Sequence, residues 1–202
     1  MKRGNVLFLI LLAIALFAVL SYAVTQSSRS SGRDAAAENA ITDAAQIMQY
    51  AANISTIIQR LRLSNNCKAS DISFEGAASN PYTHTPPAEN KCKVFHTDGG
   101  GIRYRGIELS YQEEHPFFTG AIRIEGIGTS APELTMLVHS ITPEICQHLF
   151  EKLYSFSRYT GNDTVGSAAA FIGTFSVTGM IGDQAPELAG KPIGCWDDGS
   201  QP

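Results

Sequence analysis

The stretch MKRGNVLFLILLAIALFAVLSYAV, which covers Met1–Val24, consists of a basic leader (residues 1–4) and an almost continuous apolar run. From Val6 onward only Ser21 is plainly polar. As an α-helix, with a rise of about 1.5 Å per residue, this run would be roughly 28 Å long, which is close to the thickness of a bilayer core. The sequence therefore predicts a transmembrane helix at residues 5–24. Whether this helix is kept or removed in the mature protein decides most of the function.

Two ordinary fates fit these residues. A secretory signal peptide also begins with basic residues, and Ser21-Tyr22-Ala23 would be an acceptable site for cleavage after Ala23. Alternatively, the stretch stays uncut as a signal anchor, with Tyr22 at the membrane interface. Either fate places the rest of the chain on the far side of the membrane.

The remainder of the chain has the composition of one exported domain. About 178 residues follow the apolar run, which is enough for a single core. A net charge of only -4 gives no reason to expect nucleic acid as a partner. All cysteines lie after the apolar run, and their even number favours an oxidising compartment with two disulfides, for which three pairings are possible; they are Cys67, Cys92, Cys146 and Cys195.

Helical periodicity is strongest just after a polar, serine-rich link at residues 25–33, where Gly32 predicts at least a kink. Residues 34–63 carry apolar side chains at spacings of three and four, which predicts an amphipathic helix. The stripe consists of Ile47, Tyr50, Ala51, Ile54, Ile58 and Leu61. The domain is therefore expected to begin with this helix and to extend over residues 34–202.

The middle of the chain alternates in the manner of strands. Short alternating runs separated by glycines and prolines predict an antiparallel sheet of four or more strands. The predicted strands lie at 71–75, 92–96, 102–105, 120–125, 134–139 and 168–177, and residues 99–101 form a glycine turn. Between the predicted strands at 134–139 and 168–177, Thr142 can cap a second helix that Pro143 opens and that continues to Leu153. The fold class is therefore predicted to be α+β.

These features together resemble a type IV pilin or pseudopilin. The N-terminal likeness is a short basic leader that ends in Gly4 and runs directly into a long apolar helix. The C-terminal likeness is a helix opening Thr142-Pro-Glu-Ile-Cys146, whose partner cysteine lies in Ile193-Gly-Cys-Trp196, as in the disulfide-bounded region of type IVb pilins. The resemblance follows the order of elements along the whole chain, but its individual motifs are short.

The resemblance implies a third fate for the apolar stretch. A prepilin peptidase would cut between Gly4 and Asn5, and the apolar helix would remain in the bacterial inner membrane, with its N-terminus cytoplasmic and the domain periplasmic or extracellular. The expected partners are the lipid bilayer, the peptidase and other pilin-like subunits, which would pack against the N-terminal helix. The likeness also pairs Cys146 with Cys195 and leaves Cys67 with Cys92.

Two positions depart from the pattern of the family. Pilins usually have phenylalanine or methionine directly after the cut and a glutamate at the fifth mature position, and these positions are Asn5 and Leu9 here. The family's glutamate is taken to pair with the new amino terminus of a neighbour, which Leu9 cannot do. The resemblance therefore implies a minor pilin or pseudopilin rather than the principal filament subunit.

Catalysis is not expected. The five histidines show no metal-ligand spacing, no Gly-x-Ser-x-Gly elbow or phosphate loop occurs, and no cofactor is implied. Glu113-Glu114-His115 could act as acid and base, but a solvated loop before Pro116 explains them equally well. Two other functions stay open: a single-pass anchored or secreted binding domain that does not polymerise, and an exported hydrolase.

Overall fold

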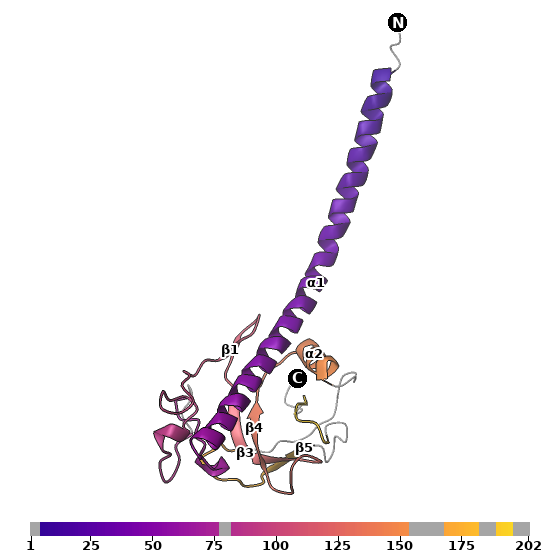
Figure 1. Cartoon of the computed structure of the whole chain (residues 1–202). Helices are drawn as coiled ribbons and strands as arrows, with labels where there is room; N and C mark the ends of the chain where they lie inside the picture. The colour runs from indigo at the N-terminus through magenta and orange to yellow at the C-terminus, as the bar shows by residue number, and fades with distance from the viewer. Residues whose placement is uncertain (1–4, 77–81, 154–167, 182–188, 196–202) are drawn as a thin grey trace. The chain divides into compact units, whose positions relative to one another are not determined.

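The computed structural model describes residues 5–76, 82–153, 168–181 and 189–195 (Figure 1). Within the first 35 residues, side chains are described at 14–18, at 21–22 and at 35. The chain divides into two compact units, Met1–Asn39 and Ala40–Pro202. It contains both helices and small sheets, so the predicted α+β class is confirmed.

Helix α1 extends over Asn5–Ser64 without interruption. Residues 25–33, predicted as a polar link, lie within this helix. Serine and glycine each weaken a helix by less than about 1 kcal/mol per residue, whereas a break would leave several backbone groups without intrahelical partners. The chain therefore continues the helix from the apolar run into the amphipathic stretch.

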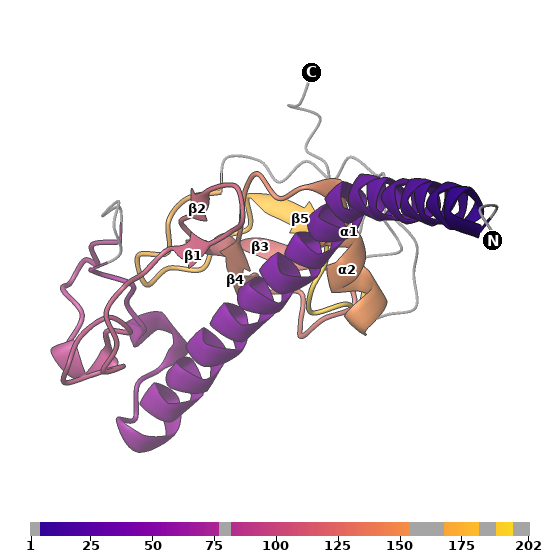
Figure 2. The same ribbon diagram turned by 90° about the horizontal axis from the view of Figure 1, so that it is seen from above.

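The C-terminal half of α1 buries the predicted face against the domain (Figure 2). Its buried positions recur at spacings of three and four, which confirms the amphipathic helix at 34–63. They are Ala40, Asp43, Ala44, Ile47, Ile54, Ile57 and Leu61. Ala40, Ala44 and Ile47 belong to one core cluster. Ile54, Ile57 and Leu61 belong to a second, aromatic cluster around Phe74 and Phe118.

The main sheet has three strands in the order β4-β3-β5. Strand β3 (Phe117–Ile124) pairs antiparallel with β4 (Glu133–Leu137) and parallel with β5 (Gly179–Ile181). A separate antiparallel pair joins β1 (Ile107–Glu108) to β2 (Glu113–Glu114). The prediction of an antiparallel sheet of four or more strands is therefore wrong for the described residues, because β5 pairs parallel with β3 and β1 and β2 form a separate sheet. The strands predicted at 120–125 and 134–139 are present as β3 and β4.

The segments 71–75 and 92–96 do not form strands. They are joined by a single parallel bridge between Ser73 and Lys93, and they follow the short 3-10 helices η1 (Ala69–Asp71) and η2 (Asn90–Cys92). Residues 72–74 are all buried, so the alternation in the sequence marks an extended core segment rather than a half-exposed strand. Residues 102–105 belong to no helix or strand, and they form no backbone pair with another described segment.

The segment predicted as a strand at 168–177 follows β3 irregularly. Phe171 N–H donates to Phe118 C=O at 3.0 Å, and Ser176 N–H donates to Gly120 C=O at 3.2 Å. Between them Gly173 has φ +88°, and a Cβ there would lie 2.8 Å from the Ser70 carbonyl oxygen. This tight turn interrupts regular pairing, which resumes only at β5.

Helix α2 covers Pro143–Leu153, as predicted. Ile145 N–H donates to the hydroxyl oxygen of Thr142 at 3.4 Å, so Thr142 acts as the cap. Ile145 and Leu149 are buried in the cluster that contains the start of the amphipathic face of α1. The helix therefore holds Cys146 on the domain core.

Candidate assembly and binding surfaces

Residues 14–18 of α1 present apolar side chains on every side of the helix. Ile14, Leu16 and Phe17 are 61%, 60% and 75% exposed, and the alanines beside them are exposed too. Five consecutive residues cover more than one helical turn, so no direction around the helix is polar here. A helix of this kind is stable in contact with lipid or with other apolar surfaces.

The predicted cleavage site, between Gly4 and Asn5, lies at the limit of the described residues. Gly4 lies outside the described residues, and Asn5 is the first residue of α1. The side chains of Asn5 and Leu9 also lie outside the described residues. Among the residues that the structure describes, no helix has the length and apolar character of a membrane span.

A groove of about 640 Å³ separates α1 from the segment 102–108. One wall carries the amide side chains of Gln46, Gln49 and Asn53, which lie on one face of α1. The opposite wall carries Arg103 and Arg105, which are both exposed. The arrangement offers hydrogen-bond donors and acceptors on one side and positive charge on the other.

Two tyrosines, one lining this groove and one in the segment 102–108, remain protonated at neutral pH. Burial of Tyr50, which lines the groove, raises its pKa, and its buried hydroxyl has no hydrogen-bond partner among the described residues. Burial likewise raises the pKa of Tyr104 to about 12, and its ring packs edge-on against Phe95. Neither hydroxyl is therefore available as a base.

The glycine turn at residues 99–101 is a structural element. The guanidinium group of Arg60 donates to the carbonyl oxygens of Gly99 and Gly100, which ties the turn to α1. A Cβ on Gly100 would overlap the Val94 carbonyl oxygen, so glycine is required by close packing. Because the carbonyls face a cation, the turn is not a cradle for phosphate.

The acid and base residues that the sequence offered for hydrolysis do not converge. Glu113 and His115 are exposed, and the carboxylate of Glu114 accepts a hydrogen bond from the neighbouring Gln112 side chain. Within the described ranges, no group of three His, Cys, Asp or Glu side chains is placed to hold a metal ion. His84 is buried against Phe171, and this burial lowers its pKa.

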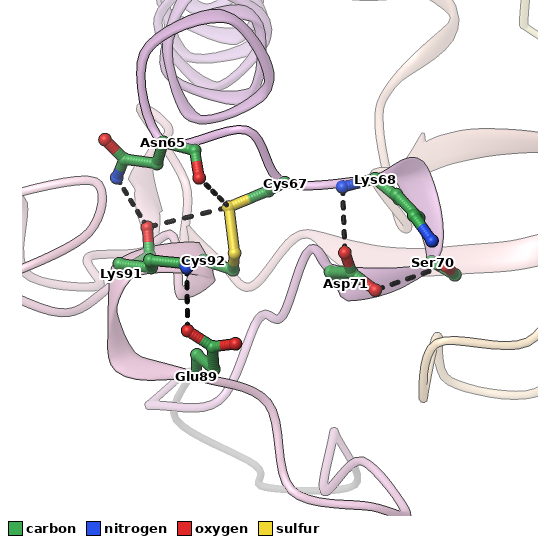
Figure 3. Close-up of a disulfide and its surroundings, with 8 residues drawn as sticks. All are labelled: Asn65, Cys67, Lys68, Ser70, Asp71, Glu89, Lys91 and Cys92. Atoms are coloured by element: carbon green, nitrogen blue, oxygen red, sulfur yellow. Dashed lines mark hydrogen bonds and ion pairs between the residues drawn. A yellow bond between two sulfur atoms is a disulfide. The ribbon is translucent and has the colours of Figure 1, made fainter.

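Both disulfides match the pairing that the resemblance implies. Cys67 is bonded to Cys92 with a Cα–Cα distance of 5.8 Å, and Cys146 is bonded to Cys195 with a Cα–Cα distance of 6.0 Å. Around the first bridge, the Asn65 side chain donates to Lys91 C=O at 2.7 Å, next to the bonded sulfur atoms (Figure 3). Each bridge belongs to one of the two core clusters, so both have a structural role.

Sequence reasoning did not identify the groove. Residues 102–105 were predicted as a strand. That prediction gave no reason to expect that Arg103 and Arg105 would lie beside a helix without an ion-pair partner among the described residues. The usable signal was the row of amides at positions 46, 49 and 53 on the polar side of an amphipathic helix. Comparison of the chain with family models, curated proteins and solved structures finds no match.

Proposed function

We propose that the chain is a non-catalytic, membrane-anchored minor subunit of a type IV pilus-like filament or secretion pseudopilus. In this role a prepilin peptidase removes residues 1–4, and residues 5–24 span the bacterial inner membrane. The domain then lies in the periplasm or outside the cell. The function is helix packing rather than chemistry.

The observation that carries the proposal is the single helix α1. It begins at Asn5, directly after the glycine of the basic leader, and continues to Ser64. Its residues 14–18 are apolar on all sides, whereas its C-terminal half is amphipathic and belongs to the domain core. One element can therefore contact lipid or other subunits at one end and anchor a folded domain at the other.

In the proposed assembly, the N-terminal helix leaves the lipid and packs against the helices of other subunits. In the bilayer, the side chains around Ile14 and Phe17 contact lipid, and in a filament they contact the helices of neighbouring subunits. Lipid is as apolar as these side chains, so close packing and the small alanines beside them, rather than the hydrophobic effect, favour association. A carboxylate at position 9 would be costly in the membrane, and Leu9 avoids this cost. A subunit that does not pair with the amino terminus of a neighbour has no need of such a carboxylate.

Site-specific photo-cross-linking tests the assembly role. The photoreactive analogue p-benzoylphenylalanine replaces Phe17 in the full chain, in the bacterium that produces the protein, and irradiated adducts are identified by mass spectrometry. We expect adducts with other pilin-like subunits. The same analogue at the exposed Lys68 is the control for non-specific capture.

Adducts confined to lipid at Phe17, in cells whose secretion or pilus system is active, would contradict assembly. They would favour the single-pass anchored domain that does not polymerise. Protein adducts that are as abundant from Lys68 as from Phe17, with the same partners, would also contradict packing through the N-terminal helix.

A further inference from the structure

The segment 102–106 has an unpaired backbone at the edge of the groove. In the described part of the chain, its N–H and C=O groups make no hydrogen bond with other protein groups. The segment leads directly into β1, which pairs with β2 from Ile107 onward. Free backbone groups that lead directly into a paired strand offer an edge to which a further strand can add.

The α1 wall of the groove also carries side chains that can form further hydrogen bonds. Gln46, Gln49 and Asn53 line it from α1, and among the described residues their amide groups make no hydrogen bond. Each amide offers both donors and an acceptor. A chain lying between the walls could therefore pair its backbone with 102–106 and direct polar groups to the amides.

The positive charge of the groove favours acidic chains among those that could bind there. Arg103 and Arg105 form no ion pair with any described residue, and Glu108 is the sole carboxylate among the described lining residues. On an extended segment, residues two apart are about 7 Å from each other on one face. The two guanidinium groups therefore match carboxylates at alternate positions of a bound strand.

We propose that this groove binds an extended acidic segment of a partner protein by strand addition along residues 102–106, with carboxylates at alternate positions paired to Arg103 and Arg105. Backbone hydrogen bonds with residues 102–106 align the bound segment, and Arg103 and Arg105 select for acidic sequences. This inference concerns the domain alone and does not depend on the proposed assembly role of the N-terminal helix.

The test uses the full chain in detergent micelles and a fluorescein-labelled peptide of alternating glutamate and valine. Fluorescence anisotropy measures its affinity, with a glutamine–valine peptide as the uncharged control. We expect the acidic peptide to bind at least tenfold more tightly than the control. The R103Q/R105Q variant should lose that tenfold preference, whereas Arg62→Gln, an exposed arginine of α1 outside the groove, should retain it.

A second variant separates loss of charge from loss of the groove. Asn53→Trp places a large side chain on the α1 wall, and we expect it to weaken binding of the acidic peptide at least tenfold while leaving both arginines in place. Equal affinity for the two peptides, or an acidic preference that survives R103Q/R105Q, overturns the proposal. Self-association that fills the groove and is abolished by R103Q/R105Q also overturns it, because the occupant is then a second copy of this chain.

Discussion

At the scale of single residues, two tyrosine hydroxyls in the aromatic core region have opposite roles. Tyr82 is 2% exposed, and its hydroxyl oxygen accepts a hydrogen bond from Phe118 N–H at 3.1 Å. The Tyr50 hydroxyl is also hidden from solvent, but in the part of the chain that the structure describes it has no hydrogen-bond partner. A buried polar group without a partner lowers stability, whereas one that satisfies a backbone donor supports the fold.

Replacing each tyrosine with phenylalanine should therefore change stability in opposite ways. We expect Tyr50→Phe to be neutral or to stabilise the protein by up to about 1 kcal/mol, because it removes an unsatisfied group. Tyr82→Phe leaves Phe118 N–H without its acceptor and should cost about 1 to 3 kcal/mol. Urea denaturation followed by circular dichroism measures both, and equal destabilisation by the two changes would contradict the assigned hydrogen bonds.

The buried side chain of His84 makes the stability of the domain depend on pH. Burial is the main cause that lowers the pKa of His84 below 6.5, while the carboxylates of Glu75 and Asp71 act in the opposite direction and Lys93 acts with burial. The unfolded chain then binds a proton at a pH where the folded chain does not. Stability from this group is complete above pH 6.5 and decreases as the pH falls from there to the lower folded pKa.

We expect the free energy of unfolding to fall between pH 7.5 and pH 5, and His84→Phe to flatten this decrease because phenylalanine does not titrate. His139, which is exposed, provides the matched control: His139→Gln should leave the slope unchanged. The pH series of urea midpoints measures the effect. A slope that is the same in His84→Phe and in the unaltered protein would rule out His84 as its source.

The fate of Asp43 illustrates what the pattern of a sequence omits. Its position, three residues after Ala40 and one before Ala44, places it on the buried stripe of α1, and the carboxylate is only 2% exposed. It accepts hydrogen bonds from the Ser110 backbone N–H at 2.9 Å and from the Ser110 hydroxyl at 2.6 Å. The helical period could predict the burial, but a partner 67 residues away leaves no local signal.

At the scale of elements, the end of α1 is fixed by its connection to η2. Asn66 adopts φ +54°, which asparagine tolerates, and Cys67 N–H then donates back to Leu61 C=O at 3.2 Å. The bridge from Cys67 to Cys92 closes a separation of 25 residues that contains little regular structure. The disulfide therefore holds the end of the helix to η2, beside the hydrogen bond from the Asn65 side chain to Lys91 C=O.

Removing this bridge should destabilise the domain. On the chain-entropy model, a loop of this length accounts for roughly 3.5 kcal/mol. We expect the C67A/C92A variant to lose about this much in urea denaturation, whereas Lys68→Ala, an exposed change beside the bridge, should stay within about 0.5 kcal/mol. A loss below about 1 kcal/mol in C67A/C92A would show that the bridge does not constrain the unfolded chain as argued.

Helices were more predictable than strands because their signals are local. The period of three and four in α1 and the Thr142-Pro143 start of α2 each lie within a few turns of the element that they specify. The pairing of β3 with β5 depends on a turn at Gly173 and on contacts 50 or more residues apart, such as Thr119 with Ala169. Alternation could therefore locate β3 and β4, but it could not identify the parallel partner.

At the scale of the whole molecule, composition and order predicted the class and the two bridges. The even number of cysteines, all after the apolar run, indicated two disulfides, and the resemblance to pilins supplied the pairing that the structure contains. The groove required three dimensions, because α1 and the segment 102–108 are distant in the sequence.

The mass of the mature N-terminal peptide tests the central claim most directly. The protein is isolated from cells with an active prepilin peptidase, and Gly4→Leu serves as the matched variant, because its side chain replaces the glycine that precedes the proposed cut. The account predicts a mature chain that begins at Asn5, with or without N-methylation, and an uncut chain in Gly4→Leu. A chain that begins at Met1 in both proteins, or at Val24, would contradict it.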